Sequence, residues 1–363
     1  MKLDYSSLDQ PLTKTEIDAY KAYATTGKAV PRYVYIIIAV VMATVVGISV
    51  LPMIAGLLAG DPEGLGFMLA MLTFFAGVVA VAAVVIKRSE RRKAKLYRFA
   101  VQNGVEPLFE KSPLSYTGMI FDEGHSRKIN EALILPDGAE LGNYEYVTGS
   151  GKNRSTHRYG YVKIPLTRNL PHMVLDGKAN NFLGFTGMTD SFDRSQKLSL
   201  EGDFDNYFTL YAPKQYERDA LYVFTPDVMQ VLIDEGKRFD MEIVDDELYA
   251  YSNTTFDLIS KKQLSSLMKI IETVGSEIRD QTKRYADENV QSTEQNIIAE
   301  KGRRLDKGFN WAIFLILGII VFNILISMLD TVDSPIGTAI YIGIGVLIWV
   351  IAGVALISRI RLR

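Results

Sequence analysis

Four long apolar runs constrain this 363-residue chain more than any other feature of its sequence. They cover residues 33–60, 65–86, 309–329 and 336–357, and none of them contains Asp, Glu, Lys, Arg or His. About 20 helical residues are enough to cross a hydrocarbon core of ~30 Å, so each run has the length of a transmembrane helix. Short acidic turns join the runs in pairs. The sequence therefore predicts four transmembrane helices arranged as two hairpins.

The distribution of Lys and Arg predicts the orientation of these hairpins. Both hairpin turns carry only acids, whereas the outer flanks are basic, and residues 87–98 hold seven basic residues and one acid. Because basic flanks stay on the cytoplasmic side, the rule predicts a multi-pass protein of the inner (cytoplasmic) membrane with both termini and the central region in the cytoplasm. We also expect the basic segment to attract the anionic headgroups of the bilayer. Its basic residues are Lys87, Arg88, Arg91, Arg92, Lys93, Lys95 and Arg98.

The central region has the pattern of an α+β domain with a largely antiparallel sheet and helices. Apolar and polar residues alternate in short runs, and Thr225-Pro226-Asp227 has the residues of a helix start. Leu264, Leu267 and later apolar residues recur at spacings of three and four, which predicts a long helix. The strands are expected at 143–148, 157–166, 206–212, 221–224, 239–243 and 248–251, with a turn at 245–247.

The predicted fold class is thus an α+β cytoplasmic domain inserted between two transmembrane α-helical hairpins. The expected division of the chain is a cytoplasmic N-terminal segment (1–32), the first transmembrane hairpin (33–86), a basic juxtamembrane segment (87–98), the cytoplasmic α+β domain (99–261), a long helix or stalk (262–308), the second transmembrane hairpin (309–357) and a basic cytoplasmic tail (358–363).

No catalytic, cofactor or metal motif emerges from the sequence. The chain has no Cys, which excludes thiol catalysis and Cys-based metal sites, and its 40 Lys+Arg balance 42 Asp+Glu, which argues against nucleic acid as a partner. The three histidines lack metal-ligand spacing, and the Gly-rich loop at 149–153 lacks the spacing of a phosphate loop. His172 and Asp176 are the only functional candidates, because a catalytic arrangement assembled by the fold stays open.

One part of the sequence resembles a known group of proteins. It is similar to bacterial membrane proteins that carry an uncharacterised domain of unknown function and are often encoded near LemA-type membrane proteins. The resemblance covers about residues 160–252 and implies a LemA-like membrane partner, but no activity and no catalytic residues. The residues that carry it are Leu170–Asp176, Asn180-Asn181, Glu201–Asp205, Arg218–Asp227 and Phe239–Tyr251.

The function predicted from the sequence is an integral membrane protein with a cytoplasmic partner-binding or scaffolding domain and no catalysis of its own. Two alternatives stay open: a membrane-tethered enzyme with a fold-assembled site, and a small oligomeric channel or transporter subunit. A deep pocket that gathers His172 with an acid would favour the enzyme, and an exposed apolar patch would favour the binding module. Association of the chain with copies of itself, as a homo-oligomer, is also expected.

Overall fold

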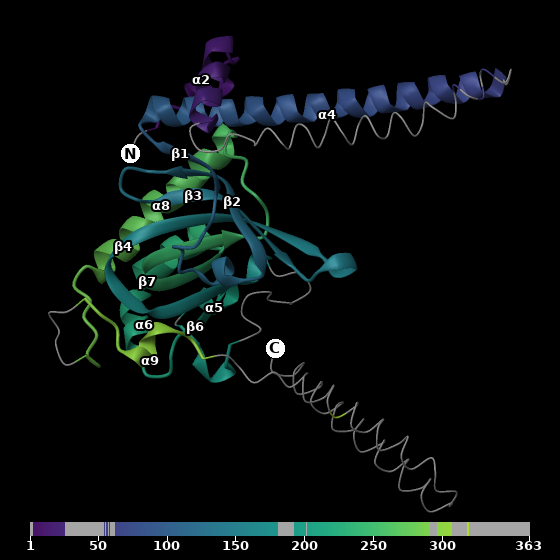
Figure 1. Cartoon of the computed structure of the whole chain (residues 1–363). Coiled ribbons are helices and arrows are strands. Elements are labelled where there is room, and N and C mark those ends of the chain that lie inside the picture. The colour runs from purple at the N-terminus through teal and green to yellow at the C-terminus, as the bar shows by residue number, and fades with distance from the viewer. Residues whose placement is uncertain are drawn as a thin grey trace, which may run out of the picture.

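Within the residues that the structure describes, the chain forms an α+β fold with one large antiparallel sheet flanked by helices (Figure 1). The structure is a computed structural model, and it describes residues 3–25, 62–180, 192–200, 202–290 and 296–306, with 54, 56, 58 and 318 as isolated positions. The strands are β1 (Glu106–Lys111), β2 (His125–Ile134), β3 (Glu140–Thr148), β4 (Ser155–Gly177), β5 (Lys197–Leu198), β6 (Phe208–Tyr211) and β7 (Asp240–Ser252).

The long strand β4 is the centre of the sheet. The strand order is β1-β2-β3-β4-β6-β5, and β7 also pairs with β4. The first part of β4 pairs with β3, with Tyr159 opposite Tyr144, and its last part pairs with β6. Its register with β7 shifts between Pro165 and Met173, where proline cannot donate to the ladder. All neighbouring strands run antiparallel, so each strand presents alternate residues to the two faces of the sheet.

Helix α8 (Lys261–Thr282) closes one face of the sheet with aliphatic side chains. Ser260 caps its start by accepting a hydrogen bond from the backbone of Gln263. The predicted helical periodicity is confirmed here, because Leu264, Leu267 and their periodic successors are buried. The other helices described are α1 (Ser6–Asp9), α2 (Lys14–Thr25), α4 (Pro62–Asn103), α5 (Phe204–Tyr207), α6 (Glu217–Val223), α7 (Pro226–Val231) and α9 (Glu300–Arg303), with short 3-10 turns η1 (Met119–Asp122), η2 (Gly151–Asn153), η3 (Lys178–Asn180) and η4 (Arg194–Gln196) and one π turn, η5 (Leu232–Gly236).

The opposite face of the sheet carries a second, aromatic core. The segment 113–123, which includes η1, packs over it with Phe121 at its centre. The ring of Phe121 lies 4.6 Å from that of Tyr144 and 5.3 Å from that of Tyr161. The two cores therefore lie on opposite sides of one sheet and differ in composition.

No helix in the described part of the chain is long and apolar enough to cross a membrane. This finding corrects the predicted fold of four transmembrane helices and the predicted multi-pass location in the inner membrane. The second predicted span, 65–86, is one end of α4, which continues into the charged segment 87–98 and ends at Asn103 on the α+β fold. The prediction rested on the length and apolar character of this run, which forms only one part of a helix of 42 residues. The other three predicted spans lie outside the described residues, apart from positions 54, 56, 58 and 318.

Three local predictions are also corrected by the structure. The predicted strand at 221–224 is the end of helix α6, with Phe224 as its C-cap. The predicted turn at 245–247 is absent, because β7 runs through it with Asp245 at a φ of 53°. The helix expected over 262–308 ends at Thr282 as α8, and within 283–290 and 296–306 only α9 is helical.

Candidate functional site

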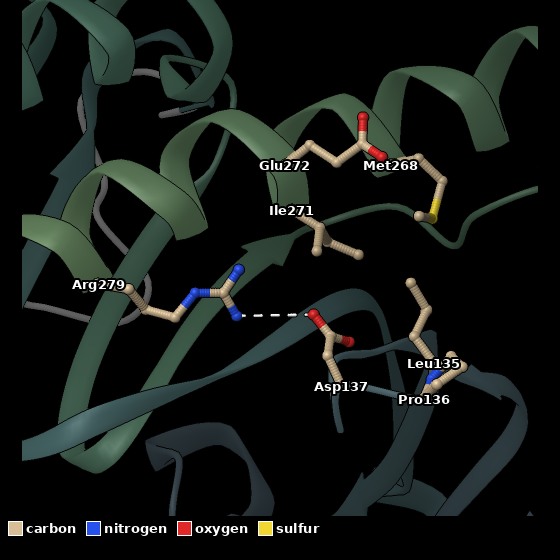
Figure 2. A pocket seen from close by; sticks show the side chains of 7 residues that line it. All are labelled: Leu135, Pro136, Asp137, Met268, Ile271, Glu272 and Arg279. Carbon is tan, nitrogen blue, oxygen red and sulfur yellow. Dashed lines mark ion pairs between the residues drawn. The ribbon is translucent and has the colours of Figure 1, made fainter. Parts of the chain in front are cut away.

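A groove lies between α8 and the turn that joins β2 to β3 (Figure 2). It has a volume of about 340 Å³. Its floor consists of the apolar side chains of Leu135, Met268 and Ile271, which are 6%, 4% and 2% exposed. These residues belong to the aliphatic core, so the groove is a place where that core reaches the surface.

Charged side chains form the rim of this groove. Asp137 comes from the turn, and Glu272 and Arg279 come from α8 (Figure 2). The guanidinium of Arg279 lies 3.6 Å from the carboxylate of Asp137. The turn itself is fixed because Asp137 also accepts a hydrogen bond from the backbone of Ala139, and because Gly138 adopts a φ of 83° that favours glycine. An apolar floor with a charged rim suits an amphipathic ligand.

A second hollow, of about 330 Å³, lies where α4 meets the sheet, and its charged groups and Asn143 are already paired. Arg92 donates to Glu131 at 2.8 Å and to Asp257 at 2.6 Å. Burial alone would lower the pKa of Arg92, but these two carboxylates outweigh it and raise the pKa. The side chain of Asn143 both donates to and accepts from the backbone of Phe256. This hollow therefore fastens α4 to the sheet and offers little to a ligand.

The candidate His172 lies on β4 and is enclosed by the protein. It is 5% exposed, and Asp176 on the same strand is 4% exposed. The Nε2 atom of His172 lies 2.8 Å from a carboxylate oxygen of Glu242, while Nδ1 accepts a hydrogen bond of 3.0 Å from the backbone N–H of Leu305. His172 is thus paired with an acid, Glu242. Neither His172 nor Asp176 lines either of the two hollows described above. Because both ring nitrogens have protein partners, His172 has no free nitrogen for a substrate.

Three carboxylates, those of Glu140, Glu242 and Glu247, accept hydrogen bonds from tyrosines of the aromatic core. Glu140 accepts hydrogen bonds from Tyr116 and Tyr161, and Glu242 accepts one from Tyr251 at 2.6 Å. Burial first, and the neighbouring carboxylate second, raise the pKa values of Tyr161 and Tyr251 well above the usual range. Strongly shifted pKa values are common at active sites, but buried structural networks shift them as well. Here the hydroxyls are enclosed and paired.

These carboxylates also hold the segment that covers the aromatic core. Thr117 donates its hydroxyl to Glu247 at 2.8 Å, and the backbone N–H of Met119 donates to Glu242 at 2.8 Å. Between them lies Gly118, where an added Cβ would stand 2.1 Å from the Tyr251 hydroxyl. The cover therefore fits closely and is fixed at successive residues.

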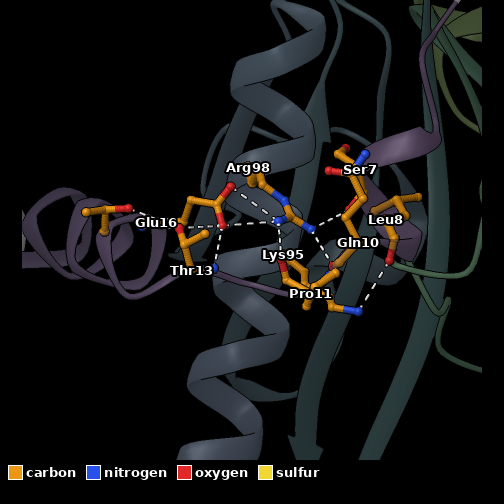
Figure 3. Close-up of polar contacts among 9 residues, drawn as sticks. Ser7, Leu8, Gln10, Pro11, Thr13, Glu16, Lys95 and Arg98 are labelled. Carbon is orange, nitrogen blue, oxygen red and sulfur yellow. Dashed lines mark hydrogen bonds and ion pairs between the residues drawn. The ribbon is translucent and has the colours of Figure 1, made fainter.

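The last residue of the predicted basic segment, Arg98, binds the N-terminal segment of the same chain (Figure 3). Its guanidinium donates to the backbone oxygens of Ser7, Gln10 and Pro11, and it reaches the carboxylate of Glu16 at 3.1 Å. These carbonyls lie within α1 or just after it, near the C-terminal end of the helix, where a cation is favourable. Arg98 thus joins α1 and α2 to α4.

The other basic residues divide into an inner and an outer group. Lys93 pairs with Glu110, Lys95 donates to the backbone of Leu8, and Arg92 is paired as described above. The outer residues are exposed, and they are Lys87, Arg88 and Arg91. Attraction of this segment to anionic headgroups stays a prediction, and the inner residues have intramolecular partners.

Sequence reasoning missed the groove and the partners of His172. The groove joins a turn at Asp137 to a helix residue, Arg279, far along the chain, and His172 meets Glu242 across 70 residues. The only available signals were the Pro136-Asp137-Gly138 turn and the apolar face of α8. Among the described residues, no group of three or more His, Asp or Glu side chains could hold a metal ion.

Comparisons with known proteins add little to this geometry. No family model matches the sequence, and no curated protein does. One solved structure, that of the mycobacterial trehalose monomycolate transport factor A, TtfA, is similar over 52% of this chain and 93% of its own, at 10% sequence identity and a TM-score of 0.32. A likeness this low supports no conclusion about fold or function. The resemblance to proteins encoded near LemA-type proteins stays a prediction.

Proposed function

We propose that this protein binds a partner protein and has no catalysis of its own, and that the groove between α8 and the β2–β3 turn receives an apolar side chain of that partner. The observation that supports this proposal is the apolar floor of the groove, open at the surface between charged residues. A volume of about 340 Å³ lies at the lower end of the range for ligand sites, which suits one or two side chains of a peptide.

The composition of the groove indicates what kind of segment would fit. Met268 is unbranched and adaptable, so the floor can accommodate aliphatic or aromatic side chains of different shape. The rim holds two carboxylates, Asp137 and Glu272, against one guanidinium. The exposed carboxylate of Glu272 beside the floor favours a partner segment in which a Lys or Arg lies near the apolar anchor.

The enclosed state of His172 argues against the enzyme alternative. A general base needs to reach the proton that it removes, at hydrogen-bond distance or through one water. His172 is 5% exposed, and its two ring nitrogens are bound to Glu242 and Leu305. These contacts give His172 a structural role, and no substrate is needed to explain its position.

Selection of peptides from a displayed random library against the full chain tests the proposal. We expect enriched peptides with an apolar anchor next to Lys or Arg. Glu272→Lys should weaken their binding about tenfold or more, since it places like charges together. Met268→Trp should weaken it as well by filling the groove.

The matched control is Asp280→Lys, at an exposed position of α8 that does not line the groove. It makes the same charge change as Glu272→Lys and should leave peptide binding unchanged. Circular dichroism would show that all variants are folded. Enrichment of no peptide, or of peptides that bind the Glu272→Lys and Met268→Trp proteins as well as the original, would refute the groove as the binding site.

A further inference from the structure

The hydrogen bonds of His172 define which nitrogen carries its proton. Nδ1 faces the backbone N–H of Leu305 at 3.0 Å, and an N–H can only donate. Nδ1 must therefore present its lone pair. The ring proton lies on Nε2, which donates to Glu242 at 2.8 Å. Glu242 accepts two further hydrogen bonds, from Tyr251 and the backbone of Met119, as an ionised carboxylate can.

Leu305 belongs to a segment that includes α9 and lies beside α6 (Figure 1), and we call residues 296–306 the strap. The strap is held at several points. The side chain of Asn296 and the backbone of Asn169 are joined at 2.8 Å, and the backbone of Ala299 donates to Asp287 at 2.9 Å. In the bond from Leu305 to His172, the acceptor is a buried imidazole nitrogen, which can instead take up a proton.

We propose that His172 is a proton-sensitive latch that binds the backbone N–H of Leu305 when it is neutral and loses this one contact of the strap when it is protonated. A proton added to Nδ1 turns the acceptor into a donor. Two N–H groups then face each other, and the buried N–H of Leu305 loses its partner, which is costly in a buried place. The bond between Nε2 and Glu242 survives protonation, so His172 keeps its position and only the strap loses a contact.

Several charged groups lie on the elements around this latch. Glu242 stabilises a positive imidazolium, and the guanidinium of Arg304 opposes it. Arg304 is itself paired with Asp245 at 3.3 Å, which reduces its opposition. Other acidic groups on these elements are Asp176 of β4, Asp193, whose backbone donates to Asp306, and Asp306 at the end of the strap.

Asp306, the residue after Leu305, is held by hydrogen bonds of its own. Its backbone N–H donates to the side chain of Gln196 at 2.9 Å, and its carbonyl accepts from the same side chain at 2.8 Å. These bonds do not titrate. Protonation of His172 should therefore loosen the strap at Leu305 and leave the contacts at Asp306, Asn296 and Ala299 in place.

Hydrogen exchange of the full chain, read by mass spectrometry, tests the latch. After correction for the pH dependence of intrinsic exchange, the peptide that contains Leu305 should lose protection about tenfold when the pH is lowered until His172 is protonated. Peptides from the aliphatic face of α8 should keep theirs.

Two variants separate the proposal from a general acid effect. His172→Asn offers an amide oxygen near the position of Nδ1 that can accept from Leu305 without titrating, and should make protection independent of pH. His172→Gln reaches toward Glu242 and leaves Leu305 without an acceptor, and should expose Leu305 at neutral and at lowered pH alike. His125→Asn, at an exposed histidine, is the control and should retain the pH response. A pH response that persists in His172→Asn, or its absence in the original protein, would overturn the proposal.

Discussion

The face of the sheet under α8 is filled mostly with aliphatic side chains, whereas the face under residues 113–123 is rich in tyrosines, and the hydroxyls of Tyr116, Tyr161 and Tyr251 reach buried carboxylates. Neighbouring residues of β7 contribute to both faces, since Ala250 packs in the aliphatic core and Tyr249 and Tyr251 pack in the aromatic core. The two faces therefore differ in side-chain chemistry, although the same strand contributes to both.

The two faces differ in what they require of their side chains. Aliphatic packing is non-directional and roughly proportional to buried area, so many combinations of side chains of suitable volume satisfy it. A buried tyrosine hydroxyl, in contrast, must find an acceptor in a defined direction. Glu140 serves Tyr116 and Tyr161 at once, so removal of one carboxylate leaves two buried hydroxyls without an acceptor. We expect the aromatic face to tolerate fewer side-chain combinations and the aliphatic face to contribute more to the free energy of unfolding.

The largest effect is expected from a charge placed in the aliphatic face. Ile243 of β7 is 1% exposed, and Ile243→Asp would bury an unpaired carboxylate at a cost of several kcal/mol. Since a domain of this kind has a stability of only about 5–15 kcal/mol, we expect the protein to unfold. Urea denaturation followed by circular dichroism measures this. Ile243→Val, which removes one methylene, should cost about 1 kcal/mol, and an unchanged transition in the Asp variant would mean that Ile243 is not core.

The second largest effect is expected at alkaline pH, and it arises from the aromatic face alone. Burial and the neighbouring Glu140 and Glu242 raise the pKa values of Tyr161 and Tyr251 well above that of an unfolded tyrosine, near 10. The stability that these neutral hydroxyls provide is therefore complete below pH 10. It is lost as the pH rises further, because the unfolded chain ionises first.

Phenolate absorbance and circular dichroism, measured together against pH, would test this. We expect the hydroxyls of the aromatic core to ionise only as the protein unfolds. Tyr251→Phe should reduce the slope of the free energy of unfolding against pH by up to ~1.4 kcal/mol per pH unit, since one titrating group is removed. Ionisation of all tyrosines near pH 10 with an intact circular dichroism spectrum would contradict the prediction.

The aliphatic face could be predicted from the sequence because its signal is local. The spacing of Leu264 and Leu267 in α8 and the alternation around Ile243 in β7 each lie within one element, and both are confirmed. Alternation also indicated the strand around Tyr159, but it did not show that β4 continues to Gly177 past Pro165. Proline usually argues against the interior of a strand, and here it lies where the register shifts.

The aromatic face and the candidate site could not be predicted in the same way. A tyrosine in an alternating strand gives no indication of which carboxylate will receive its hydroxyl, and Tyr116 finds Glu140 only through the fold. Asp245 was read as part of a turn because of its acidic neighbours, but it is a left-handed residue within a continuous strand. The groove requires that α8 lies against the β2–β3 turn, which depends on the topology of the whole sheet.

A smaller effect is expected where the covering segment approaches the aromatic face. An alanine at Gly118 would place a Cβ 2.1 Å from the hydroxyl of Tyr251 and 3.2 Å from the ring of Tyr249, so the segment must lift. We expect Gly118→Ala to cost about 1–3 kcal/mol, as overpacking of a core does. Gly77→Ala in α4, where a Cβ meets nothing within 4 Å, is the matched control and should not destabilise the protein. Equal melting temperatures for the two variants would argue against a close cover.

The smallest effect distinguishes the two faces most sharply, because it measures directional coupling. The hydroxyls of Thr117 and Tyr249 both donate to the same oxygen of Glu247, whose other oxygen lies 3.3 Å from the ammonium of Lys163. Thr117→Val keeps the shape of the side chain and removes one donor, at an expected cost of about 1 kcal/mol. A double-mutant cycle with Tyr249→Phe should give a coupling energy of ~0.5 kcal/mol or more, since the two donors share one acceptor. Distant substitutions, such as Thr117→Val with Val274→Ala on the aliphatic face, should be additive. If the shared pair were additive as well, the carboxylates would act as independent acceptors and not as a network.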